Sequence, residues 1–200
     1  MKVKYLMPIL VVVLITLSMS FTNTLEAGQY FDVNSLLKDV YYVYGENGET
    51  WVGGTGFAME YNNRYFLITA GHILNNDSWG VHENLRFKAN YSTKWVYPEL
   101  IAYSTDYMSK NDYAIFYSDK VKSGLKVDTE GDNSTFILGC RKLGLNTIRD
   151  YKLMSANGES GSPAIDAEGE VTEISTTNYS QYCTDISLVE SIINSYARFQ

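Results

Sequence analysis

Gly158-Glu159-Ser160-Gly161-Ser162-Pro163 is the stretch that best distinguishes the folds open to this chain. Upstream, residues 67–72 form an apolar run that ends in a histidine, Leu-Ile-Thr-Ala-Gly-His. Between them, residues 111–116 read Asn-Asp-Tyr-Ala-Ile-Phe, so an acid opens a second apolar run. A serine hydroxyl becomes a nucleophile when a base accepts its proton and a third group orients that base. These stretches supply the three groups in the order His72, Asp112, Ser160.

Length and composition favour a single β-rich domain. The chain has 200 residues, enough for one globular domain or two small lobes that share one unit. Tyrosine is abundant, at 17 residues, and tyrosine fits half-buried strands. The net charge of -7 argues against a nucleic-acid partner, because such a partner requires a basic face.

The first 20 residues have the pattern of an export signal. Lys2 and Lys4 precede an apolar stretch over residues 6–17, and small residues occupy positions 18 and 20. A positive start, an apolar centre and small residues at the cleavage site are typical of a signal peptide. We therefore expect cleavage after Ser20 and a secreted mature protein.

The sequence leaves three other forms of the N-terminal region open. Cleavage after Ala27 is one, and an uncleaved membrane anchor formed by residues 5–21 is another; membrane contact is expected only through such an anchor. A third is a latent form from which part of the N-terminal segment, residues 21–39, must be removed.

Cys140 and Cys183 are the only cysteines. In an exported chain they could form a disulfide, or they could be two free, buried thiols. Neither has a neighbouring histidine or a second cysteine, so the sequence favours neither a metal site nor a thiol nucleophile.

From residue 40 onward, short apolar or alternating runs separated by turn residues predict an all-β fold, a barrel or a sandwich. Strands are expected at 40–44, 51–59, 65–69, 85–89, 95–103 and 113–117, then at 135–140, near 151–154, at 164–166 and at 170–175. The polar residues 118–134 are predicted to cross between two halves. Apolar residues at helical spacing predict an amphipathic helix over 185–199.

The glycines around Ser160 have a chemical use. A tight turn can direct the backbone N–H groups of Gly158 and Ser160 at one point. Such donors stabilise the oxyanion of a tetrahedral intermediate by about 3 kcal/mol each. Residues 158–160 therefore predict an oxyanion hole next to the nucleophile.

These motifs resemble those of trypsin-like serine proteases. Thr-Ala-Gly-His at 69–72 looks like their histidine motif, and residues 112–115, Asp-Tyr-Ala-Ile, are similar to their aspartate segment. Residues 158–163 resemble their Gly-Asp/Asn-Ser-Gly-Gly/Ser-Pro motif, and Gly-Thr-Gly-Phe at 54–57 resembles the strand before the histidine strand. The likeness spans about residues 40–199 and looks closest to the bacterial glutamyl endopeptidases.

The resemblance implies a chymotrypsin-like fold over residues 40–200. It would consist of two six-stranded-type antiparallel β-barrels, at about 40–117 and 135–177, followed by a C-terminal α-helix at about 185–199. It also implies an exported serine endopeptidase that acts on proteins or peptides through an acyl-enzyme, with no metal or cofactor. Ser160 would attack, His72 would act as base and then acid, and Asp112 would orient His72.

The resemblance also places a substrate pocket, with two departures from the family pattern. Glu159 stands where the glutamyl endopeptidases have Asn or Asp, and residues 174–177, Ile-Ser-Thr-Thr, lack the histidine of their glutamate-binding pocket. The pocket is therefore expected to be uncharged and of mixed polarity, with no preferred side chain predicted. By position, its lining residues would be Met154, Ser155, Ser175, Thr176 and Thr177.

The sequence also offers alternatives to this assignment. Asp106 and Asp119 are rival candidates for orienting His72, and His82, in a polar stretch without a motif, is expected in a surface or loop position. A protease-like binding or scaffold protein without catalysis remains the alternative function.

Three other hydrolase classes fit the sequence poorly. No histidine follows Ser160, which excludes an α/β-hydrolase order. The chain is short for a subtilisin and lacks alternating βα patterns. Two histidines without a His-Glu-x-x-His motif argue against a metal hydrolase.

Overall fold

The structure is a computed structural model that describes residues 32–198, except for 49, 77–79, 83, 132, 142–144, 153–156 and 177–182. The expected signal peptide, residues 1–20, and residues 21–31 lie outside the described residues. None of the helices in the described part is long and apolar enough to cross a membrane.

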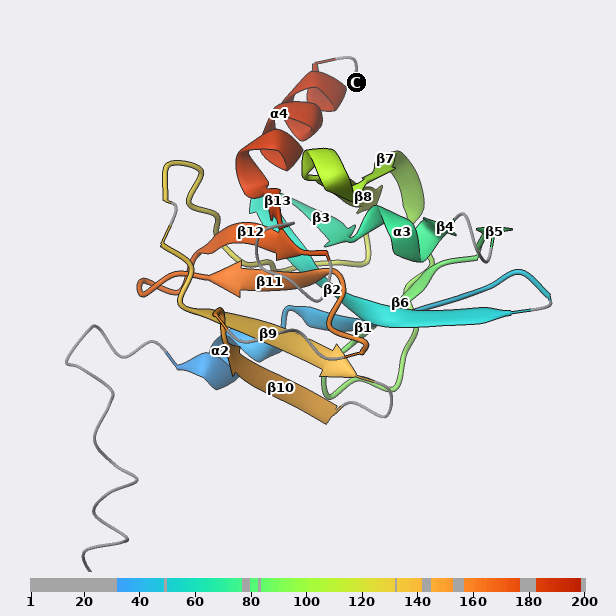
Figure 1. Cartoon of the computed structure of the whole chain (residues 1–200), viewed down its shortest axis with the longest axis horizontal. Helices are drawn as coiled ribbons and strands as arrows, with labels where there is room; N and C mark the ends of the chain where they lie inside the picture. The colour runs from blue at the N-terminus through green and yellow to red at the C-terminus, as the bar shows by residue number, and fades with distance from the viewer. Residues whose placement is uncertain are drawn as a thin grey trace, which may run out of the picture. The chain divides into compact units, whose positions relative to one another are not determined.

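The first half of the described chain forms a six-stranded antiparallel sheet in the order β6-β1-β2-β3-β8-β7 (Figure 1). Its strands are β1 (Val40–Glu46), β2 (Trp51–Tyr61), β3 (Arg64–Thr69), β6 (Arg86–Ala89), β7 (Glu99–Asp106) and β8 (Asn111–Tyr117). Five of the six strands agree with the sequence prediction. The strand expected from residue 95 begins at Glu99 instead, and Val96 forms only an isolated bridge with Phe87.

Both faces of this sheet are buried, in two separate apolar clusters. Phe57 and Met59 of β2 belong to a cluster that includes residues of the second half, whereas Ala58 between them belongs to a cluster without residues of the second sheet. Ile68 and Leu67 of β3 divide in the same way. Successive side chains of a strand point to opposite faces. The strands therefore lack the alternation of apolar and polar residues that a sheet with one exposed face shows. The cluster that contains Phe57 and Met59 is a core shared by the two halves.

The second half forms a five-stranded antiparallel sheet, in the order β10-β9-β11-β12-β13. Its strands are β9 (Phe136–Arg141), β10 (Leu145–Asp150), β11 (Ser162–Ile165), β12 (Val171–Ser175) and β13 (Thr184–Asp185). Between the sheets, Leu125 bridges Met59 of β2 and Val127 bridges Val171 of β12. Residues 118–131 thus run between the two halves.

The strand expected near 151–154 was placed too late in the sequence. The structure has β10 at Leu145–Asp150, residues 151–152 form a turn, and 153–154 lie outside the described residues. The prediction missed β10 because the strand is rich in polar side chains, among them Thr147 and Arg149. Its backbone pairs fully with β9, from Leu145 opposite Arg141 to Asp150 opposite Phe136.

The C-terminal helix is confirmed as α4 (Ile186–Ala197), drawn in red in Figure 1. The side chain of Asp185 accepts a hydrogen bond of 2.8 Å from the Ser187 N–H and so caps the helix. Ile186, Val189 and Ile193 are buried in the core that joins the two halves. The remaining short elements are α2 (Val33–Leu37), α3 (Gly71–Leu74), β4 (Asn75–Asn76), β5 (Gly80–Val81) and the 3-10 turn η1 (Tyr107–Ser109).

The two cysteines are free thiols, each about 1% exposed, which is the second of the two states left open by the sequence. Burial raises the pKa of Cys140 to about 11 and that of Cys183 to about 12. Since the thiolate is the reactive form, both cysteines are protonated and unreactive at neutral pH.

For His82, expected in a surface or loop position, the structure confirms the loop but not the surface. It follows β5 in a loop, but the residue is fully buried. Its Nε2 lies 3.4 Å from the Thr50 hydroxyl, and its Nδ1 has no hydrogen-bond partner among the described residues. Burial lowers the pKa of His82 below the usual 6.5.

Acid is therefore expected to destabilise the protein through His82. The unfolded chain binds a proton near pH 6.5, whereas the folded chain resists it, so stability falls as the pH drops below 6.5. We expect the stability lost between about pH 7.5 and about pH 5.5 to be smaller in His82→Gln than in the wild type. Urea unfolding at both pH values measures this difference. Equal losses in the two proteins would contradict the assignment.

Candidate active site

His72 and Asp112 are in direct hydrogen-bond contact. The Nδ1 of His72 lies 2.6 Å from Oδ2 of Asp112, and the His72 backbone N–H donates to Oδ1 at 2.8 Å. The Asp112 side chain is fully buried, while that of His72 is 23% exposed. A carboxylate only accepts hydrogen bonds, so the proton of the neutral imidazole is on Nδ1. The Nε2 of His72 is then free to accept a proton.

Strand register brings these two residues together. In the antiparallel pair β3·β8, Thr69 lies opposite Ala114. His72, three residues beyond Thr69, therefore lies alongside Asp112, two residues before Ala114. The chain can pass this close to the Ser104 backbone because residue 71 is a glycine. A Cβ at this position would lie 1.8 Å from the Ser104 carbonyl oxygen.

Asp112 is held from the other side by Thr184, a fully buried residue of β13. The Asp112 N–H donates to the Thr184 hydroxyl at 3.0 Å, and that hydroxyl donates to the Asp112 carbonyl at 3.2 Å. The rival acids lie elsewhere: Asp106 and Asp119 are exposed, and Asp106 accepts from the Ser109 N–H at 3.1 Å. Of the three acids, Asp112 is the one that contacts His72.

Ser160 lies on a tight turn that is attached to the first sheet through Thr55 of β2. The Thr55 N–H donates to the Ser160 carbonyl at 2.8 Å, and the Thr55 hydroxyl donates to the Gly158 carbonyl at 2.8 Å. The same hydroxyl accepts from the Cys140 N–H at 3.0 Å. Thr55 thus links the turn to β9 as well.

The turn also touches the end of β3, where His72 follows. Gly161 has φ +85°, and a Cβ there would lie 2.9 Å from the Ala70 nitrogen. The Gly161 N–H donates to the Ser175 carbonyl at 2.6 Å, so the turn is fixed to β12 too. The nucleophile candidate therefore sits between the two sheets, close to the strand that delivers His72.

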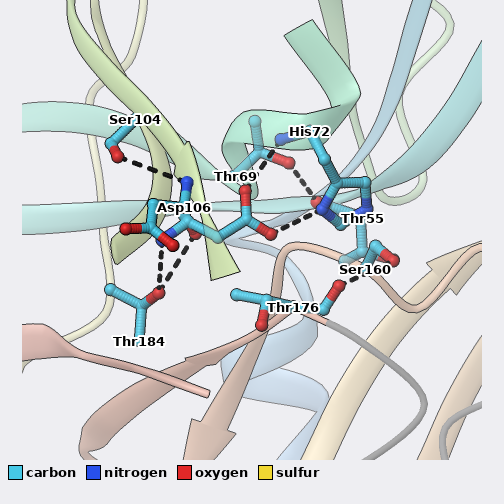
Figure 2. Close-up of polar contacts among 9 residues, drawn as sticks. Thr55, Thr69, His72, Ser104, Asp106, Ser160, Thr176 and Thr184 are labelled. Atoms are coloured by element: carbon cyan, nitrogen blue, oxygen red, sulfur yellow. Dashed lines mark hydrogen bonds and ion pairs between the residues drawn. The ribbon is translucent and has the colours of Figure 1, made fainter. Parts of the chain in front are cut away.

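The hydroxyl of Ser160 donates to the carbonyl of Thr176 at 3.4 Å (Figure 2). Within the described part of the chain it makes no hydrogen bond to His72. Contacts between nucleophile and base are often long in a site without substrate and shorten when substrate binds.

The backbone of the turn directs the Ser160 N–H away from the Ser162 N–H. The Ser162 N–H donates to the Glu159 carbonyl at 2.9 Å. In a trans peptide the C=O and the next N–H point in opposite directions, so this bond turns the Ser160 N–H the other way. Neither that N–H nor the Gly158 N–H donates to any of the described residues. Gly158 has φ +90°, a backbone conformation that glycine adopts readily.

Glu159 does not face the substrate side of the turn. Its side chain is 1% exposed, and Oε2 accepts a hydrogen bond of 2.9 Å from Nε of Arg149 on β10. Glu159 therefore forms a buried ion pair with Arg149.

The pocket assignment stays a prediction. Met154, Ser155 and Thr177 lie outside the described residues. Ser175 and Thr176 are each about 1% exposed, and their carbonyl groups accept from Gly161 and Ser160 as described above. Ser175 and Thr176 do lie next to the nucleophile turn.

Three positioning residues were not found from the sequence. Thr55 lies inside the Gly-Thr-Gly-Phe motif, and that context could have indicated it. Thr184 and Arg149 carry no local signal, because each acts on a partner distant in the sequence: Thr184 on Asp112 and Arg149 on Glu159.

No model of a known protein family matches the chain, and no curated protein matches it in sequence. Solved structures do match. A thermostable serine protease from an extremophilic microorganism has TM-score 0.65 and 12% identity, over 82% of this chain and 99% of that one. A serine endoprotease from Yersinia pestis has TM-score 0.61 and 15% identity, over 83% of this chain and 65% of that one.

A third match is an HtrA-type protease with a bound tripeptide, at TM-score 0.60 and 16% identity, covering 82% of this chain and 61% of that one. The fold is the chymotrypsin-like double barrel. At these identities the likeness establishes the fold of the chain, and the chemistry must be argued from its own residues.

Proposed function

We propose that this protein is an exported serine endopeptidase. The observation that carries the proposal is the buried Asp112 carboxylate, which binds both the ring and the backbone of His72. That arrangement leaves Nε2 of His72 as a base, and a glycine-rich turn places Ser160 close to the strand that delivers it. The chymotrypsin-like fold supports the same assignment.

In the proposed reaction, the Ser160 hydroxyl attacks the carbonyl carbon of a peptide bond as its proton passes to Nε2 of His72. Asp112 stabilises the imidazolium that forms, without itself taking the proton. The new oxyanion is held by the N–H groups of Gly158 and Ser160. His72 then protonates the leaving amine, which produces an acyl-enzyme on Ser160. Water attacks this ester with His72 again as base; His72 then passes that proton to the Ser160 oxygen as the ester bond breaks, and the acid product leaves.

Labelling with a fluorophosphonate probe tests the proposal. We expect the wild-type protein to form a covalent adduct on Ser160, with loss of fluoride, and to cleave a denatured protein substrate. Ser160→Ala should lose both properties, because no nucleophile remains. Mass spectrometry of the labelled peptide identifies the modified residue.

Ser162→Ala is the matched control. Ser162 follows this turn as the first residue of β11, and its hydroxyl is buried and has no hydrogen-bond partner among the described residues. We expect Ser162→Ala to be labelled like the wild type. Folded wild-type protein that forms no adduct would favour the alternative, a protease-like binding or scaffold protein.

Export is tested separately. We propose that residues 1–20 direct secretion and are removed, on the basis of the charged start, the apolar stretch and the small residues described above. The N-terminal sequence of protein recovered from the medium is expected to start at Phe21. Protein that keeps Met1 and sediments with membranes would instead support the anchor at residues 5–21. An active form that starts near residue 39 would support a latent precursor.

A further inference from the structure

We propose that Asn157-Gly158 is a site of spontaneous covalent modification, in which ring closure between the two residues disables the oxyanion hole and limits the active lifetime of the protein. Asn157 lies directly before the nucleophile turn. This inference rests on the proposed function, since Gly158 supplies one of the oxyanion donors. The chemical change itself requires only the two residues and water.

The reaction is an attack by a backbone nitrogen on the side chain that precedes it. The Gly158 nitrogen bonds to Cγ of Asn157, the bond from Cγ to Nδ2 breaks, and the displaced nitrogen leaves as ammonia with the proton of the Gly158 N–H. A cyclic imide results. Water then opens the imide at either of its carbonyl groups, which produces aspartate or isoaspartate at position 157. Because both reacting groups belong to adjacent residues, the ring closure is intramolecular and needs no catalyst.

The Gly158 nitrogen is available as the attacking group. Its N–H donates to none of the described residues. Glycine has no Cβ to shield the nitrogen, and Gly158 has φ +90°, a conformation that glycine adopts readily. A donor of an oxyanion hole must be unpaired before the oxyanion forms. The property that suits Gly158 to catalysis therefore also leaves its nitrogen open to reaction with Asn157.

The Asn157 side chain is equally unconstrained. The residue is exposed, and within the described part of the chain its side-chain amide makes no hydrogen bond. Water therefore has access to Cγ, and no contact with a described residue holds the amide away from the Gly158 nitrogen.

Asn47 and Gly48 form a second Asn-Gly pair that serves as an internal comparison. This pair is also exposed, and Gly48 also has φ +90°. The difference lies in the amide, because Oδ1 of Asn47 accepts from the Thr50 N–H at 2.9 Å and from the Thr50 hydroxyl at 3.1 Å. Ring closure at Asn47 has to break these bonds first. We therefore expect Asn157 to react sooner than Asn47.

Each product impairs the oxyanion hole. In the imide, the Gly158 nitrogen carries no proton, so one donor is lost. Isoaspartate adds a methylene group to the backbone directly before Gly158, whose carbonyl is held by the Thr55 hydroxyl at 2.8 Å. Aspartate keeps the backbone but places a carboxylate next to the donors, where negative charge develops in the transition state. We therefore expect labelling of Ser160 to fall with each of the three.

The test incubates the Ser160→Ala and wild-type proteins at mildly alkaline pH, where the backbone nitrogen loses its proton more readily. Ser160→Ala cannot degrade itself, so peptide mass spectrometry can follow Asn157 and Asn47 in an intact chain. We expect a gain of about 1 Da at residue 157 before the same gain at residue 47. In the wild type, fluorophosphonate labelling per intact chain is expected to fall in proportion to the unmodified fraction of Asn157.

Three further proteins separate this reaction from other losses of activity. Asn157→Ser has no side-chain amide and is expected to keep its own starting rate of labelling while the wild type loses its rate. Asn47→Ser is the matched control and is expected to lose labelling like the wild type. The third is wild-type protein labelled before the incubation, in which the phosphonyl oxygen accepts from the Gly158 N–H. Its Asn157 is expected to last longer than that of Ser160→Ala.

Four results would overturn the inference while leaving the proposed function intact. The first is an Asn157 that outlasts Asn47, and the second is protein that is modified at residue 157 but still labels fully. The third is an Asn157→Ser variant that loses labelling as fast as the wild type. The fourth is equal survival of Asn157 in the labelled and Ser160→Ala proteins. A fresh wild-type protein that forms no adduct would overturn the proposed function and this inference together.

Discussion

Replacing Asp112 with asparagine is expected to lower kcat by about four orders of magnitude while the chain stays folded. The carboxylate accepts two hydrogen bonds, from the His72 N–H and from Nδ1. An asparagine side chain of similar shape offers one acceptor oxygen and one NH2 donor. If the oxygen keeps the backbone N–H of His72, the NH2 group faces Nδ1, which must then be unprotonated. The proton moves to Nε2, and His72 can no longer accept one from Ser160.

Asp106→Asn is the matched control for this experiment. Asp106 is the rival acid on the neighbouring strand, and the variant is expected to keep kcat within about twofold of the wild type, as exposed positions away from the site usually do. Hydrolysis of one peptide substrate by both variants gives the comparison, and circular dichroism checks that both are folded. Equal activities in the two variants would contradict the assignment of Asp112.

Replacing Gly161 with alanine is expected to destabilise the protein by roughly 3 kcal/mol or more and to abolish labelling of Ser160. Gly161 has φ +85°, which costs an alanine about 1–2 kcal/mol. In addition, the new Cβ would lie 2.1 Å from the Thr55 carbonyl oxygen and 2.2 Å from the Thr69 hydroxyl. Both neighbours are buried, so the turn has to move, and Ser160 moves with it.

Gly48→Ala isolates the steric part of this effect. Gly48 has φ +90°, but a Cβ there would meet nothing within 4 Å. Its alanine variant should show only the backbone cost and keep full labelling. Denaturant unfolding measures the stability of both variants. If both alanine variants lose the same free energy of unfolding and both proteins are labelled, the prediction that the turn packs closely against Thr55 is wrong.

Most strands and the candidate triad could be predicted from local sequence. Long apolar runs such as that of β3 indicate strands without any knowledge of their partners, and the motifs around His72, Asp112 and Ser160 each carry their own context. The β10 strand could not be placed, because its polar side chains have no strand signal of their own. One of them, Arg149, pairs with Glu159, a residue that no local pattern connects to it.

By itself, the sequence determined the order of the three candidate catalytic residues, the β-rich class and the C-terminal helix. These properties depend on neighbours along the chain: periodic apolar residues, glycine turns and caps. The tertiary structure decided which acid contacts His72, that both cysteines are free, that His82 is buried, and that Thr55, Thr184 and Arg149 hold the site. Each of these depends on contacts between residues far apart in the sequence, which strand register and packing create and which no local pattern records.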